Sequence, residues 1–122
     1  MSIRCLLVDD SDAFLKAASD LLQREGVTVL GVAVSSAEAL RQARALRPDV
    51  ILVDIGLGHE SGFDLARLLA QDAQAGRAEV ILISAHAETD YAELIAESPA
   101  AGFLVKSELS ARAIGQILGH KP

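Results

Sequence analysis

Acidic, hydroxyl and basic side chains stand at the ends of apolar runs in this 122-residue chain. Asp9 and Asp10 follow the run IRCLLV, and Asp54 closes the run VILVD. Ser84 ends EVILIS, and Lys106 ends GFLVK. Carboxylates, a hydroxyl and an ammonium together can hold a divalent cation and the oxygens of a phosphoryl group. Their repeated position after apolar runs predicts one shared site.

The three carboxylates would repel one another if the fold brought them together. Two unit charges about 4 Å apart repel by roughly 4 kcal/mol at an effective dielectric of about 20. Lys106 can offset one of these charges. A hard divalent ion held by a few carboxylates, with its other positions left to water and a phosphate, is the usual arrangement for Mg²⁺. The acids therefore predict a magnesium site.

Phosphoryl transfer is the chemistry that this set of groups favours. A carboxylate can act as the nucleophile and become an aspartyl phosphate, while metal and lysine neutralise charge on the transferred oxygens. The chain contains neither a P-loop nor a kinase glycine-rich loop, so a nucleotide donor has no recognisable binding loop. We expect the phosphate to arrive on a phosphorylated protein or a small phosphodonor.

Short strands and helices alternate along the chain and must position these groups. Runs rich in Val, Ile and Leu predict strands at 3–8, 27–34, 49–55, 79–84 and 101–106. Apolar residues at helical spacing predict helices at 12–25, 35–47, 62–73, 88–97 and 108–118. Asp12, Ser35 and Ser107 are the expected caps of the first, second and fifth helices.

Five such strand–helix units predict an α/β fold with a doubly wound parallel sheet. Most of the strands lack alternation of apolar and polar residues, which indicates burial on both faces. Ligands of open α/β sheets bind beyond the carboxyl ends of the strands. If the first and third strands are neighbours, the three acids crowd one edge of the sheet.

Composition excludes several other classes of protein. The net charge of −6 opposes binding to a nucleic-acid backbone, and the basic residues form no stripe. The single Cys5 lies in an apolar run and suits a reducing compartment. Neither a signal peptide nor an apolar run long enough to span a membrane is present, so we expect a cytoplasmic protein.

The chain resembles the receiver domains of bacterial response regulators over nearly all of its length. The resemblance rests on the acids at 9, 10 and 54, on Ser84 and Lys106, on Gly62 eight residues after Asp54, and on Phe103 three residues before Lys106. It implies a flavodoxin-like fold with strand order 2-1-3-4-5. It also implies a single receiver domain over residues 1–122, in which the tail 119–122 is a candidate start of a linker.

The resemblance further implies a role for each acid. Asp54 would accept the phosphoryl group. Asp10, Asp54 and the backbone carbonyl of Gly56 would hold Mg²⁺, and Asp9 would assist through water. The partner would be a sensor histidine kinase or a phosphotransfer protein, and pairing with a second copy after phosphorylation stays open.

The remaining matched positions imply a switch. Ser84 and Lys106 would contact the phosphoryl oxygens. Phe103 stands where receivers carry the aromatic side chain that turns inward when the hydroxyl is drawn to the phosphate. The responding surface would be the fourth helix, the fifth strand and the fifth helix, including Tyr91.

Three residues depart from the common receiver pattern. Ser107 replaces the proline that often follows the lysine, as in receivers of LuxR-type regulators, whose output is a DNA-binding helix-turn-helix. Gly58 replaces another frequent proline in GLGHESG, so we expect a mobile loop there. Phe103 replaces the common tyrosine and lacks its hydroxyl.

Other readings of the same residues stay open. The aspartates could only cap a helix, Ser84 could be satisfied by backbone, and Lys106 could be a solvated charge. A degenerate receiver would use the pocket for phosphate-independent protein binding. A phosphatase of the haloacid-dehalogenase type usually carries a second acid two residues after its nucleophile, and this chain has Gly56 there. Catalysis is therefore expected to be limited to the domain's own phosphorylation and dephosphorylation.

Overall fold

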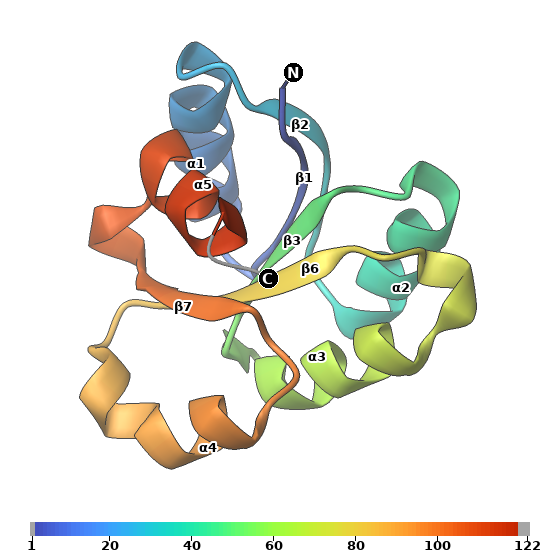
Figure 1. Ribbon diagram of the computed structural model, residues 1–122, viewed down its shortest axis with the longest axis vertical. Helices are drawn as coiled ribbons and strands as arrows, with labels where there is room; N and C mark the ends of the chain where they lie inside the picture. The colour runs from blue at the N-terminus through green and yellow to red at the C-terminus, as the bar shows by residue number, and fades with distance from the viewer. Residues whose placement is uncertain (1, 120–122) are drawn as a thin grey trace.

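The computed structural model describes residues 2–119, so the tail expected at 119–122 lies outside the described residues except for Gly119. A five-stranded parallel sheet has the order β2-β1-β3-β6-β7 (Figure 1). This order equals 2-1-3-4-5 when the main strands are counted along the chain, which confirms the predicted topology. The strands are β1 (Arg4–Val8), β2 (Thr28–Ala33), β3 (Val50–Asp54), β6 (Glu79–Ser84) and β7 (Gly102–Val105).

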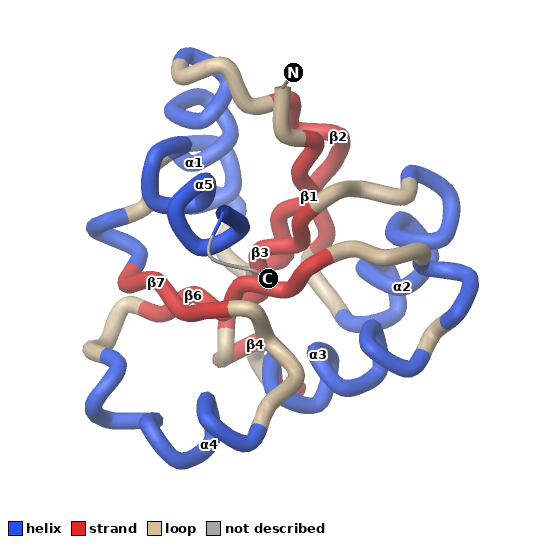
Figure 2. The backbone as a smooth tube through the Cα atoms, viewed as in Figure 1, coloured by secondary structure: helices blue, strands red, loops and turns tan. Residues whose placement is uncertain are grey.

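Helices cover both faces of the sheet (Figures 1 and 2). One face carries α1 (Asp12–Arg24) and α5 (Ala111–Gly119), and the other carries α2 (Ser36–Leu46), α3 (Gly62–Gln71) and α4 (Ala92–Glu97). Short 3-10 turns lie between these elements, at η1 (Ala73–Ala75), η2 (Glu88–Tyr91) and η3 (Lys106–Glu108). The arrangement is the predicted doubly wound sandwich.

The unbroken apolar runs of the strands divide between two cores, because successive side chains of a strand point to opposite faces. In β3, Ile51 and Val53 join the cluster under α2 and α3, while Val50 and Leu52 join the cluster under α1 and α5. All five residues of β3 are buried, Asp54 included. The central strand therefore ends with a carboxylate at the limit of the apolar core.

The last two helices differ from the sequence prediction. The segment predicted as one helix over 88–97 is a 3-10 turn followed by the six-residue α4. The helix predicted to begin at 108, with Ser107 as cap, begins at Ala111 instead. Leu109 has an extended backbone and is buried in the core under α1 and α5, which delays the helix, and the Ser110 hydroxyl accepts the Ala113 N–H at 3.0 Å.

The first two helices begin where they were predicted, within one residue. The cap of α1 is Ser11 rather than Asp12: its hydroxyl accepts the Phe14 N–H at 3.2 Å, and Asp12 is the first helical residue. Ser35 caps α2 as expected and accepts the Glu38 N–H at 3.3 Å. Hydroxyl groups at these positions satisfy N–H groups that have no partner inside the helix.

The glycine-rich segment after β3 forms a hairpin that the sequence analysis did not predict. Strands β4 (Gly56–Leu57) and β5 (Glu60–Ser61) pair antiparallel around a two-residue turn at 58–59. Gly58 has φ +61°, a value that proline cannot adopt because its ring fixes φ near −65°. The glycine that replaces the common proline therefore forms part of a tight turn, and the expected mobility of this segment stays a prediction.

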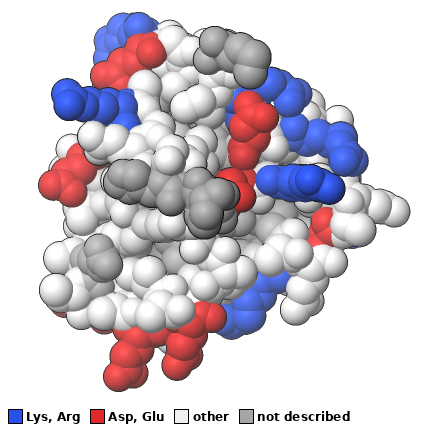
Figure 3. Space-filling model, viewed as in Figure 1, with Lys and Arg blue, Asp and Glu red and all other residues white. Residues whose placement is uncertain are grey.

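Charged side chains are dispersed over the surface. On the face shown in Figure 3, the described basic residues form no continuous stripe, and acidic side chains gather at the lower edge, over α4. Among residues 2–119, no helix has the length and apolar character needed to cross a membrane.

Candidate functional site

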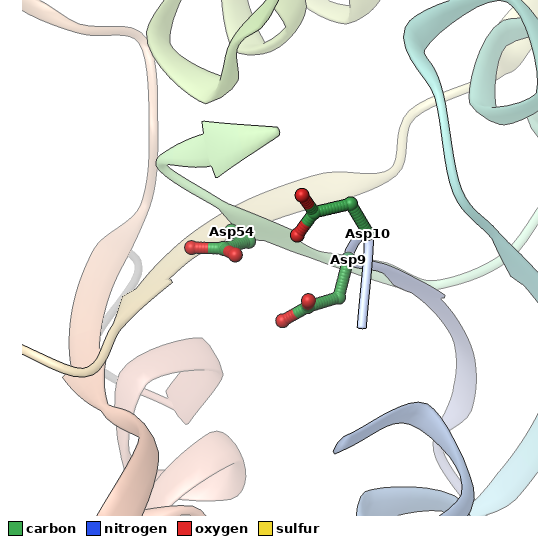
Figure 4. Close-up of side chains that lie close together, drawn as sticks. All are labelled: Asp9, Asp10 and Asp54. Carbon is green, nitrogen blue, oxygen red and sulfur yellow. The ribbon is translucent and has the colours of Figure 1, made fainter. Parts of the chain in front are cut away.

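Three carboxylates meet beyond the carboxyl ends of β1 and β3, as the strand order requires. Asp9 and Asp10 project from the end of β1 toward the side chain of Asp54 at the end of β3 (Figure 4). One oxygen from each carboxylate lies within 4.8 Å of the others. Asp9 and Asp54 are buried, whereas Asp10 is exposed and forms no hydrogen bond or ion pair with any described residue. The predicted acidic cluster is therefore present.

Lys106 brings a positive charge into this cluster. Its Nζ lies 2.6 Å from Asp9 Oδ2 and 3.3 Å from Asp54 Oδ2. Burial lowers the pKa of Lys106, but the two carboxylates outweigh burial and hold that pKa above its usual value. The ammonium therefore stays charged and balances part of the acidic charge.

Asp54 is held by its own backbone neighbour as well as by Lys106. Burial is the largest effect on its pKa and raises it, the Gly56 N–H lowers it, and the nearby Asp9 raises it, with a net shift upward. The Gly56 N–H donates to Asp54 Oδ1 at 3.2 Å. The Asp54 carboxylate is thus oriented by a backbone donor on one oxygen and by the ammonium on the other.

Ser84 ends β6 beside this group, and the residue is 2% exposed. Its hydroxyl oxygen accepts the His86 N–H at 3.0 Å. This bond uses the oxygen as an acceptor and leaves the hydroxyl proton available for donation. Ser84, Lys106 and Asp54 line the same pocket, together with Tyr91.

Phe103 lies on β7, which β6 separates from the strand that carries Asp54. It is half-buried and packs against the core under α2 and α3, as Tyr91 does. The Tyr91 ring in turn lies 6.4 Å from that of Phe63, centroid to centroid. Tyr91 therefore lines the pocket and contacts Phe63 of α3 through its ring. Phe103 packs against the same core.

Phe14 is a site residue that the sequence analysis did not identify, since its helical spacing indicated only a core position. The Lys106 ammonium lies 4.4 Å from the centroid of its ring, within cation–π range. The ring face therefore holds Lys106 against the carboxylates from the α1 side. The sequence carries no signal for this contact, because it joins residues 92 positions apart.

The residues of the cluster fit a hard divalent cation. Asp9 Oδ2 is the one buried side-chain N or O atom among the described residues that lacks a hydrogen bond, and the Lys106 ammonium is its charged neighbour. The Lys106 ammonium, 2.6 Å away, compensates the charge of this oxygen, whereas Asp10 forms no ion pair with any described residue and is left for a second cation. Carboxylate oxygens are hard donors of the type that Mg²⁺ prefers.

The sequence profile of the response regulator receiver domain matches residues 5–117. This chain belongs to the response regulator receiver domain family. Membership places it in two-component signalling and agrees with the parallel sheet, its strand order and the acids at the strand ends.

Several known proteins are similar to this receiver domain. The response regulator GacA of Pseudomonas viridiflava is 30% identical over 105 residues, which cover 85% of this chain and 48% of that protein. A two-component response regulator of the LuxR family from Aurantimonas sp. SI85-9A1 has a TM-score of 0.85 at 27% identity and covers 99% of this chain and 88% of that chain. The chain spans about half or less of the length of the curated relatives it matches.

A third relative shows a modified receiver. A response regulator from Burkholderia pseudomallei has a TM-score of 0.79 at 26% identity, covering 96% of this chain and 66% of that chain. Its structure holds a phosphorylated aspartic acid, a calcium ion and citrate. Other relatives are protein-glutamate methylesterases, in which the similarity covers 17–23% of the protein.

Proposed function

We propose that this receiver domain is a phosphorylation-dependent switch in which Asp54 accepts a phosphoryl group from a histidine kinase or a phosphotransfer protein in the cytoplasm. The observation that carries the proposal is the convergence of Asp54, Lys106 and the hydroxyl of Ser84 on one pocket beside two further carboxylates. The phosphorylated aspartic acid in the Burkholderia relative supports it.

The reaction uses the Asp54 carboxylate as the nucleophile. One of its oxygens forms a bond to phosphorus while the bond between phosphorus and the donor's leaving atom breaks, and the electron pair departs with the donor. The Gly56 N–H and the Lys106 ammonium orient the carboxylate before attack. Ser84 donates its hydroxyl proton to a transferred oxygen, and Lys106 neutralises charge on the same group.

Asp10, Asp54 and the Gly56 carbonyl would hold Mg²⁺, with Asp9 assisting through water. When bound, the ion neutralises charge on the phosphoryl oxygens. The phosphate adds a charge of about −1.5 to −2 and strong acceptor oxygens, which can bias a two-state surface by a few kcal/mol. That surface is α4, β7 and α5, with Phe103 and Tyr91 among the residues that change.

Acetyl phosphate tests the acceptor directly. Incubated with Mg²⁺ and acetyl phosphate, the wild type should gain the mass of one phosphoryl group, and the Asp54→Asn variant should gain none. Intact mass spectrometry measures both. Labelling that persists in the variant would move the nucleophile elsewhere. A wild type that responds to neither acetyl phosphate, beryllofluoride nor a cognate kinase would favour the degenerate, phosphate-independent receiver.

Magnesium alone should stabilise the unphosphorylated protein. A ligand that binds only the folded state at a hundredfold excess over its Kd contributes about 2.7 kcal/mol, which raises Tm by roughly 8–13 °C in a domain of this size. Asp10→Asn should remove most of the rise, because it removes a proposed ligand. Asp10 forms no hydrogen bond or ion pair with any described residue, so the substitution breaks no other contact there. Calorimetry at constant ionic strength measures Tm. An equal rise with NaCl would show that screening, not binding, is the cause.

A further inference from the structure

The hairpin formed by β4 and β5 is joined to α2 by a single side chain. Glu60 Oε1 accepts the backbone N–H of Ser36 at 2.9 Å, across 24 positions of sequence. Ser36 is the first residue of α2, so its N–H has no acceptor within the helix. Glu60 therefore connects the hairpin that follows Asp54 to the N-terminus of α2.

This connection matters because the hairpin is small. An isolated two-stranded hairpin is marginal in water, and this one has only two residues in each strand. Other contacts also hold it: Leu57 is buried in the core, and the Gly62 N–H donates to the Ile55 carbonyl at 3.0 Å. The bond between Gly62 and Ile55 lies at the base of the hairpin, whereas Leu57 is paired with Glu60 beside the turn. Glu60 adds the hydrogen bond that joins this end of the hairpin to α2.

The turn and the first hairpin residue both lie against the acidic cluster. A Cβ placed on Gly58 would lie 3.4 Å from Asp10 Oδ2, so the turn packs beside that carboxylate. Gly56, whose N–H donates to Asp54 Oδ1, is paired with Ser61, the neighbour of Glu60. The position of the hairpin therefore sets the backbone around two of the three carboxylates.

We infer that Glu60 is a positioning residue for the cation site: by binding the N-terminus of α2, it holds the hairpin where Gly56 and the turn complete the cluster. The inference rests on the proposed magnesium binding. Glu60 lies outside the group of acids that approach one another closely, so it acts through the hairpin and not as a ligand.

Calorimetric titration of MgCl₂ into matched variants tests this role. Glu60→Ala removes the acceptor and should weaken Mg²⁺ binding by about tenfold, the lower end for residues that support metal ligands. Glu60→Gln keeps an acceptor oxygen without the charge and should bind within about twofold of wild type. Glu97→Ala removes one exposed acidic charge from α4 and serves as the control.

Amide hydrogen exchange of residues 56–61 gives a second readout. Exchange there should accelerate in Glu60→Ala and stay near the wild-type rate in Glu60→Gln. Wild-type affinity in Glu60→Ala would overturn the positioning role while leaving magnesium binding intact. An equal loss in Glu60→Gln would also overturn it, because charge rather than the hydrogen bond would be responsible. A wild type that binds no Mg²⁺ would overturn both proposals.

Discussion

Gly62→Ala is expected to destabilise the protein by about 2–3 kcal/mol, the upper part of the range of about 1–3 kcal/mol for forcing extra volume into a packed interior. A Cβ at this position would lie 2.7 Å from the Cα of Ile55 and 2.8 Å from the carbonyl carbon of Asp54. These are backbone atoms, so no side-chain rotation can relieve the overlap. The start of α3 must separate from the end of β3, which also displaces Asp54 and should slow its labelling by acetyl phosphate.

Gly115→Ala is the matched control for this substitution. Gly115 lies in α5, and a Cβ there meets no atom within 4 Å. Alanine is favoured over glycine within a helix by about 0.8–1 kcal/mol, so this variant should be more stable than the wild type. Urea unfolding of both variants measures the difference. A Gly62→Ala protein with wild-type stability would show that α3 does not require the close approach.

Lys106→Met is expected to destabilise the protein by about 2–3 kcal/mol at pH 7.5. Removing one partner of a buried ion pair costs about 3–5 kcal/mol, and the smaller figure reflects a site partly open to water. Methionine keeps most of the length of the side chain but removes the ammonium, so the cation–π contact with Phe14 is lost and Asp9 and Asp54 have no nearby positive charge. Denaturant unfolding of the variant and the wild type measures the loss.

Acid and magnesium should both reverse this loss. Burial already raises the pKa of Asp54, and removal of the ammonium raises it further. A carboxyl group whose pKa is higher in the folded state binds a proton on folding, so stability falls as pH rises through that pKa. The variant should therefore regain stability as the pH falls from 7.5 through the raised pKa of Asp54, and Mg²⁺ should stabilise it more than it stabilises the wild type.

Lys16→Met separates this effect from the general loss of a positive charge. Lys16 is exposed and pairs with Asp20 at 3.3 Å on the surface of α1. Exposed pairs of this kind contribute about 0.2–1 kcal/mol, so the control should change stability little at any pH. If Lys106→Met were as stable as this control at pH 7.5, the ammonium would have no structural role in the cluster.

The parallel sheet could be predicted from the sequence, and the meeting of the acids followed from the strand ends together with the strand order that the resemblance to receiver domains implied. Alternating apolar runs and helical segments determine a parallel sheet, and parallel strands place their carboxyl ends on one edge. Asp9, Asp54, Ser84 and Lys106 all end strands or directly follow them. Their proximity therefore required no knowledge of side-chain contacts.

The features that the sequence did not predict depend on contacts between distant residues. Burial of Leu109 delays α5, and the hairpin after β3 is held by Glu60 and by the core position of Leu57. The contact between the Phe14 ring and the Lys106 ammonium also joins residues that are far apart in the sequence. The spacing of apolar residues along the chain carries no information about such distant contacts. Local preferences leave several conformations nearly equal in free energy, and tertiary packing selects one of them.

The six residues of α4 include none that is buried, and a 3-10 turn precedes them. Local opening of a protein segment costs little free energy where few apolar groups leave water on closing. The α4 segment should therefore open at a lower cost in free energy than β3, which is buried along its whole length. Rearrangement can then be confined to α4 while the strand that carries Asp54 stays fixed, so the domain can have a variable surface without an unstable fold.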